Sequence, residues 1–551
     1  MSTDSTVGLP LLQEAPTYPA LPPGTSRGVD RFAAAVVSLG LIAAVVIALP
    51  HKPFELDRYF VPKELVLHVV ALILIVAVLS RSRSFDLDVA DKLIGVFLAF
   101  SAVSALFATN HWLAQRALAV SISSAIVYWS ARRLGVEMRR PLMFAAATAA
   151  FVAAASALAQ AYGVESEYFT LARAPGGTLG NRNFMAHIAA IGLPAIVWST
   201  VTARRPAGAL IGSLAGGIVA AALVLSRSRA AWLAVGASAI VLILPVLVAR
   251  KYGVAGDVRG RFARLALAML IGALLAVALP NELNWSSESP YLDSARGVVD
   301  FRKGSGKGRV AQYRNTLGMA LANPVLGVGP GNWAVRYPRF APANDKSLAD
   351  DGMTANPWPS SDWAAFVSER GFFATFALFG ALAAIFFGAF RGWATLADRD
   401  AVMARLALIG TLTAAMVVSA FDASLLLAAP AMLVWTMLGA TAGPRRNPSA
   451  RTLAPRTRTI LMLATVFFGA TSVARSAAQM VAMNSVGTGG RTAGWVAAAA
   501  WDPGSYRINY RVAELYARRG RCGMARPYAR RAAQLFPNSP AAKRIVRRCG
   551  R

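Results

Sequence analysis

The sequence predicts an all-α membrane protein, a polytopic bundle of about thirteen transmembrane helices. The chain has 551 residues, of which 56% are hydrophobic and only 15% charged. Its mean hydropathy of +0.48 is too apolar for a soluble protein, which must cover its surface with polar side chains. The apolar residues gather in runs of about 20, the length that crosses a bilayer as a helix. Short clusters of arginine and lysine separate many of these runs.

The runs divide the chain into five parts. Residues 1–30 are polar and Pro-rich, so we expect a disordered cytoplasmic tail without a cleavable signal peptide. A first part of the bundle occupies 31–280, and a second part occupies 363–480. Between them, 281–362 form a polar loop rich in Gly, Pro and Asn, far longer than an ordinary connection, and 481–551 form a C-terminal tail. The predicted spans lie near residues 31–50, 62–80, 90–108, 114–131, 140–162, 184–203, 207–225, 229–250, 262–280, 363–390, 402–420, 423–441 and 457–476.

Basic residues are concentrated in alternate loops, which sets the expected orientation. Arg132 with Arg133, Arg204 with Arg205, and their equivalents in every second loop belong on the cytoplasmic side. The N-terminus is then cytoplasmic, and the 281–362 loop and the C-terminus are periplasmic, as in a bacterial inner membrane protein. The net charge of +30 is therefore first a topology signal, and we expect no nucleic-acid partner.

Six arginines stand on the side that should be poor in positive charge. Any single one could snorkel to lipid headgroups, but six on one face indicate an anionic ligand or a structural partner. They are Arg173, Arg182, Arg227, Arg229, Arg309 and Arg314.

The C-terminal tail has the spacing of a helical repeat. Pro503 and Pro537 are 34 residues apart, the period of a tetratricopeptide repeat, and the segment between them predicts two amphipathic helices with a break at Gly520. Flanking segments would supply neighbouring helices. We expect the tail either to contact a partner protein or to cap the periplasmic face of the bundle.

Cysteine and histidine are too sparse for a metal centre. The four histidines are widely spaced, and the only cysteines are Cys522 and Cys549. We expect neither a metal nor another cofactor. In an oxidising compartment the two cysteines could bridge the second helix of the repeat to the terminal helix.

Three segments carry candidate chemistry. "APGGTLGNRNFMAH", Ala174 to His187, places a Gly/Asn turn and an arginine at a helix start, where backbone amides can bind an anion. "LSRSRAAWLAVG", from Leu225, has an arginine pair at the outer end of a helix. "GRVAQYRNTLGMALANPVLGVGPGNWAVRYP", from Gly308, is a basic amphipathic helix followed by a turn dense in Gly and Pro.

In this order and spacing, the three segments resemble the O-antigen ligase and O-antigen polymerase superfamily. The resemblance implies a membrane glycosyltransferase with a GT-C-like bundle that works without a metal. Such an enzyme moves a glycan from an undecaprenyl-diphosphate carrier to a sugar, as a polymerase, or to a lipid or protein acceptor, as a ligase. By resemblance, Arg229 and Arg309 match the family's diphosphate-binding arginines. Arg182 and Arg314 are candidates for the same diphosphate-binding role because of their position. Arg173 and Arg227 rank after them as candidates.

The sequence departs from the family at one motif. The family's Glu-x-Gly is present as Glu369 to Gly371, but Ser360 to Trp363 stands where a histidine motif is expected. The nearby carboxylates, Glu369 first and Asp362 second, are then the candidates for accepting a proton from the acceptor hydroxyl. Asp362 could instead be a helix N-cap, and Glu369 could pair with an arginine. His187, inside an apolar helix, is interpreted as a satisfied core histidine.

Two other classes of function remain open. A transporter of the same lipid-linked glycan would also need many helices and arginines, although no inverted repeat is evident. A scaffold without activity could organise envelope assembly through the tail. For each class of function, the partners that we expect are membrane lipids and a lipid-linked glycan.

Overall fold

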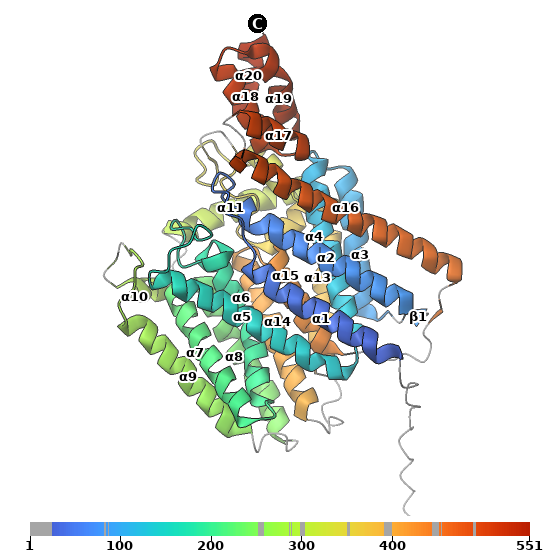
Figure 1. Cartoon of the computed structure of the whole chain (residues 1–551), viewed down its shortest axis with the longest axis vertical. Helices are drawn as coiled ribbons and strands as arrows, with labels where there is room; N and C mark the ends of the chain where they lie inside the picture. The colour runs from blue at the N-terminus through green and yellow to red at the C-terminus, as the bar shows by residue number, and fades with distance from the viewer. Residues whose placement is uncertain are drawn as a thin grey trace, which may run out of the picture.

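The computed structural model describes residues 25–81, 84–85, 87–251, 258–285, 287, 289–297, 304–349, 353–390, 399–443, 451–452, 454–488 and 492–550. Within them, each predicted span is a helix of one bundle (Figure 1), and the predicted all-α polytopic fold is confirmed. The bundle helices are α1 (Thr25–Val46), α2 (Asp57–Arg81), α3 (Val89–Leu106), α4 (His111–Arg133), α5 (Arg139–Ala161), α6 (Arg182–Val201), α7 (Pro206–Ser226), α8 (Arg229–Lys251), α9 (Val258–Ala278), α13 (Asp362–Gly388), α14 (Arg399–Phe421), α15 (Ala428–Ala442) and α16 (Pro455–Thr488).

Shorter elements lie between and after these helices. Residues 25–30, expected to be disordered, form the start of α1, and the rest of that predicted tail lies outside the described residues. The shorter elements are β1 (Ser84–Phe85) and β2 (Arg451–Thr452), the 3-10 helices η1 (Val136–Met138), η2 (Gly177–Leu179) and η3 (Tyr337–Arg339), the loop helices α10 (Pro290–Arg296), α11 (Gly304–Ala322) and α12 (Trp333–Arg336), and the tail helices α17 (Ala493–Trp501), α18 (Tyr506–Arg518), α19 (Cys522–Leu535) and α20 (Pro540–Gly550).

Among the described residues, eleven helices are long and apolar enough to cross a membrane. The other two predicted spans are α15, which is apolar but has only 15 residues, and α4, which carries too many polar side chains. Both are largely buried within the bundle. A helix surrounded by other helices meets little lipid, so it can carry polar groups that a peripheral helix cannot. This position explains the polar side chains of α4, whereas α15 falls short only in length.

Alternate loops gather at opposite ends of the bundle, as the predicted threading requires. At one end the loops assigned to the cytoplasm meet: Arg132 pairs with Asp88 and Asp91 at 2.6 and 2.8 Å, and β1 pairs with β2. At the other end the loops assigned to the periplasm meet, for example where the Asn110 amide donates to the Asn332 side chain at 2.7 Å. The assignment of each end to a compartment stays a prediction.

The C-terminal tail is continuous with the last bundle helix. Helix α16 has 34 residues and is about 51 Å long, well beyond the roughly 30 Å of a hydrocarbon core. The predicted boundary at residue 480 therefore falls inside this helix. Helices α18 and α19 are joined at Gly520, whose φ of +71° favours glycine. The predicted disulfide joins Cys522 to Cys549, and so α19 to α20. The tetratricopeptide interpretation stays a prediction.

The tail packs on the long loop of residues 281–362. Tyr506 and Phe536 share an apolar cluster with Trp333 and Tyr337 of the loop. The Asn538 side chain donates to the Val335 carbonyl at 3.3 Å. In Figure 1 the tail helices stand at one end of the bundle, beyond α16. This arrangement agrees with the expected cap on the bundle.

Candidate functional site

The loop before α6 is held by its own polar groups. The Gln160 side-chain oxygen accepts from the amides of Gly176 and Gly177 at 2.9 and 2.8 Å. The Arg182 amide donates to the Arg173 carbonyl at 2.9 Å, which brings these two arginines together. The Asn183 amide donates to the N-cap side chain of Asn181. Because these two helix-start amides already have partners, anion binding here falls to the arginine side chains.

The turn between α7 and α8 presents the next two arginines. Arg227 has a φ of +53°, which is left-handed backbone that a non-glycine residue rarely adopts. Its Nε donates to Ser294 Oγ at 2.7 Å, and Arg229 Nη1 donates to the Gly297 carbonyl. Both side chains are half-buried. They thereby fix α10 against the turn.

Trp285 connects the two arginine segments. The guanidinium carbons of Arg182 and Arg227 lie over its ring, 5.2 and 4.6 Å from the centroid. Arg182 also interacts electrostatically with Arg173 and Arg227. We call Arg173, Arg182, Arg227 and Arg229 the arginine cluster.

The charge of the arginine cluster suits an anionic ligand. Asp293 is close enough to Arg227 to interact with it, and one carboxylate does not neutralise the four arginines of the cluster. Burial lowers the pKa of Arg227, so desolvation of its charge opposes ionisation there. Arginine forks match phosphate oxygens bidentately. Sequence reasoning did not select Trp285, which stands in a loop of irregular pattern.

The two arginines of α11 occupy different positions. Arg309 is half-buried and interacts electrostatically with His187 and Tyr313. Burial raises the pKa of Tyr313 to about 12, and its hydroxyl donates to the Ser360 carbonyl at 2.5 Å. Arg314 follows five residues later and is exposed; about 100° of rotation per residue places it on another face of the helix. The structure thus brings Arg309 toward α6 and leaves Arg314 outside the arginine cluster.

His187 is not the satisfied core histidine that the sequence suggested. Its side chain is fully buried, and neither ring nitrogen has a hydrogen-bond partner in the part of the chain that the structure describes. The nearest acid is Asp422, whose Oδ2 lies 4.0 Å from His187 Nε2. Asp422 also accepts from the Asn183 side chain at 3.4 Å. Sequence reasoning did not select Asp422, because it lies more than 200 residues from both partners.

Asp362 holds a turn and does not cap its own helix. The N-cap of α13 is Ser361, whose side chain accepts from the Ala364 amide, so the predicted cap role of Asp362 is wrong. The Asp362 carboxylate is fully buried and accepts four hydrogen bonds at 2.7 to 3.2 Å. The donors are the Ser424 amide and hydroxyl and the amides of Leu425 and Leu426. The carboxylate therefore orders the turn before α15.

Glu369 binds the Gly-rich turn of the third motif. Its two carboxylate oxygens accept from the amides of Gly331 and Trp333 at 2.8 and 3.0 Å. The alternative partner, Arg370, instead lies 4.9 Å from the ring centroids of both Phe97 and Phe366. Each carboxylate oxygen of Glu369 accepts one hydrogen bond from a backbone amide, so lone pairs remain for a further donor.

Two glycines let the Gly-rich turn approach Glu369 so closely. Gly371 has a φ of +82° and breaks the helical geometry of α13. A Cβ on it would lie 2.1 Å from the Val325 carbonyl oxygen, and one on Gly327 would lie 2.3 Å from the Glu369 carbonyl carbon. The backbones then exchange hydrogen bonds, with the Gly329 amide donating to the Glu369 carbonyl at 2.9 Å. This contact explains why the "PVLGVGPGNW" turn and the Glu-x-Gly segment occur together.

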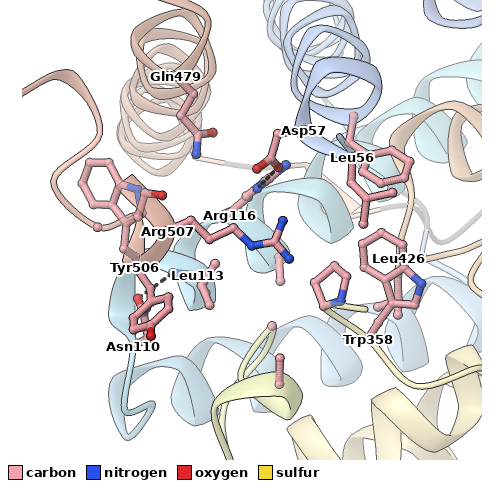
Figure 2. A pocket seen from close by; sticks show the side chains of 18 of the residues that line it. Leu56, Asp57, Asn110, Leu113, Arg116, Trp358, Leu426, Gln479, Tyr506 and Arg507 are labelled. Carbon is pink, nitrogen blue, oxygen red and sulfur yellow. Dashed lines mark hydrogen bonds and ion pairs between the residues drawn. The ribbon is translucent and has the colours of Figure 1, made fainter. Parts of the chain in front are cut away.

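A cavity of about 190 Å³ opens beside Glu369 (Figure 2). Its walls come from α2, α4, the Gly-rich turn, the segment before α13 and the tail. Arg116 lies in this wall and is held bidentately by Glu64 at 2.8 and 2.9 Å and by Asp57 at 3.0 Å. Glu369 lines the cavity, whereas Asp362 does not.

Comparison with known families agrees with this geometry. Residues 213–379 match the family model described as O-antigen ligase. Over these residues the chain is similar to an O-antigen ligase domain. This domain runs from α7 into α13 and contains Arg227, Arg229, Arg309 and Glu369, while Arg173 and Arg182 precede it. No curated protein matches the chain significantly. The ligase domain, set in a multi-pass helical membrane protein, supports a role in glycan transfer with lipid-linked glycan and acceptor as substrates.

Proposed function

We propose that this protein transfers a glycan from an undecaprenyl-diphosphate carrier to an acceptor hydroxyl at the periplasmic face of a bacterial inner membrane. The observation that carries the proposal is the arginine cluster, in which Arg182 and Arg227 lie over the ring of Trp285 and Arg173 interacts electrostatically with Arg182. The ligase domain match supports the same reaction class. The arginine side chains supply the positive charge that the leaving diphosphate requires.

The reaction breaks the bond between the anomeric carbon and the diphosphate oxygen. The electron pair stays on the diphosphate, where the arginines stabilise the developing charge. The acceptor oxygen forms the new bond to the anomeric carbon, and its proton passes to a carboxylate. We assign this role to Glu369, since it lines the cavity and keeps free lone pairs. Asp362 is saturated by four donors and lies outside the cavity, so we assign it to structure.

The test is transfer by purified protein with Arg182→Lys and Arg227→Lys. Lysine keeps the charge but loses the planar fork, so each change should cost about 2–4 kcal/mol in the transition state, or roughly 30- to 1000-fold in turnover. Arg314→Lys is the matched control, because it makes the same change at an exposed arginine of α11 that lies outside the arginine cluster, and it should leave turnover unchanged. Wild-type turnover in both cluster variants would make the arginines structural. Translocation of the lipid-linked glycan without transfer would favour the transporter alternative.

A further inference from the structure

The cavity beside Glu369 has a wall that the ligase domain does not supply. Asp502, Tyr506 and Arg507 of the C-terminal tail line it together with Phe60 and Trp358. Arg507 extends from α18 into the cavity (Figure 2). The tail therefore forms part of the cavity wall and is not only a cover over the bundle.

Several polar atoms at this cavity are buried without a hydrogen-bond partner in the part of the chain that is described. They are Asn110 Nδ2, Trp112 Nε1, Gln479 Oε1 and Asp502 Oδ1, and all four residues line the cavity. Asn110 is 1% exposed, and Gln479 and Asp502 are each 6% exposed. Two of these atoms are donors and two are acceptors. A ligand that satisfies them must carry groups that both donate and accept, as hydroxyl groups do.

The remaining wall is apolar and aromatic. Phe60, Trp358, Tyr506 and Phe536 line the cavity with leucine and valine side chains. A sugar ring combines apolar C–H faces with a rim of hydroxyls, and so fits a site in which aromatic rings surround a few polar atoms. The volume of about 190 Å³ corresponds to about six water molecules at roughly 30 Å³ each, which suits one sugar ring.

The charge of the lining excludes the diphosphate itself. Four carboxylates face or border the cavity, from Asp57, Glu64, Glu369 and Asp502, against the guanidinium groups of Arg116 and Arg507. Arg116 is already bound by Glu64 and Asp57. A dianionic headgroup would be repelled here, whereas a sugar without strong negative charge would not.

Aromatic side chains extend from the cavity to the first turn of α6. The Phe60 ring lies 5.2 Å from that of Trp358 and 5.5 Å from that of Phe184. Phe184 is in the first turn of α6, two residues after Arg182. These ring contacts connect the cavity to the helix that begins with Arg182 of the arginine cluster.

We propose that this cavity is a subsite for one sugar residue of the glycan, closed by the C-terminal tail through Asp502, Tyr506 and Arg507. The inference rests on the glycan transfer proposed above. The sugar comes either from the acceptor or from the lipid-linked donor, and both present the same hydroxyls and C–H faces.

The experiment measures binding to purified full-length protein in lipid nanodiscs. The first probe is oligosaccharide released by mild acid from the source cell's own surface polysaccharide, which carries no diphosphate; the second is undecaprenyl diphosphate without sugar. Arg507→Met and Gln479→Leu change two cavity residues on different helices. Arg530→Met on α19 is the control, since it removes the same charge from an exposed site outside the cavity.

We expect Arg507→Met and Gln479→Leu to weaken oligosaccharide binding about tenfold or more, with undecaprenyl diphosphate binding and the Arg530→Met variant unchanged. In transfer assays, a higher KM for acceptor alone identifies the acceptor as the source of the sugar, and a higher KM for donor alone identifies the donor; either outcome supports the subsite. Transfer by wild-type protein that does not bind the oligosaccharide overturns the subsite and leaves the proposed function standing. Oligosaccharide binding without any transfer supports the subsite and contradicts the proposed function. Equal weakening in all three variants also overturns the subsite.

Discussion

Replacing Glu369 by glutamine tests whether this carboxylate holds the Gly-rich turn, performs chemistry, or does both. In the structure, one oxygen accepts from the Gly331 amide and the other from the Trp333 amide, at 2.8 and 3.0 Å. Glutamine retains one acceptor oxygen and turns an NH₂ group toward the second amide. The hydrogen bond to the retained oxygen then loses its ionic character. At the other position the new NH₂ group and the backbone amide are both donors, so that hydrogen bond is lost.

The magnitude follows from these two changes. Loss of ionic character costs about 1 kcal/mol, and a buried amide without an acceptor costs about 1–3 kcal/mol. Relief from burying a charge offsets part of this sum. We therefore expect Glu369→Gln to lower the free energy of unfolding by about 2–3 kcal/mol, measured by unfolding in mixed micelles with increasing denaturing detergent.

Activity per folded molecule separates structure from chemistry. If Glu369 accepts the proton, turnover of the folded variant should fall roughly 100-fold or more. Asp362→Asn is the control: it also weakens a buried carboxylate that accepts backbone amides, but it lies outside the cavity and should keep its turnover per folded molecule. Unchanged stability in Glu369→Gln would refute the clamp. Unchanged turnover would refute the proton acceptor.

Three further predictions concern the tail and the topology. Reduction of the Cys522–Cys549 disulfide, which encloses 27 residues of separation, should destabilise the tail by about 3.5 kcal/mol by loop entropy; labelling of both thiols in protein purified without reductant would show that the bond does not form. Burial raises the pKa of Asp502 above its ordinary value near 4, so this carboxyl group binds a proton more tightly in the folded state than in the unfolded state. The free energy of unfolding should therefore fall as the pH rises from about 4 through the raised pKa. Asp502→Asn should remove this slope, and an identical slope in variant and wild type would contradict the assignment. Reporter fusions after residue 490 should be periplasmic and fusions after residue 133 cytoplasmic, whereas the reverse pattern would invert the threading.

The membrane fold and the three motif segments follow from the sequence because their signals are local. A run of apolar residues or a basic loop can be recognised without its neighbours in space, so all thirteen bundle helices match predicted spans. The pairing of Cys522 with Cys549 was likewise the only one that the composition allowed. Arg182, Arg227 and Arg229 were selected by their unexpected side of the membrane, and the structure brings them together around α10 and Trp285.

Only the tertiary structure decided what the carboxylates and the tail contact. Glu369 accepts from amides 36 and 38 residues away, Asp362 accepts from a turn more than 60 residues away, and Asp422 meets His187 across 235 residues. The cavity joins α2 and α4 to α18, which follows them in the chain by hundreds of residues. A hydrogen bond or a cavity wall depends on where distant backbones meet. Hydropathy and residue spacing describe each segment by itself. They contain no information on which distant segments come into contact.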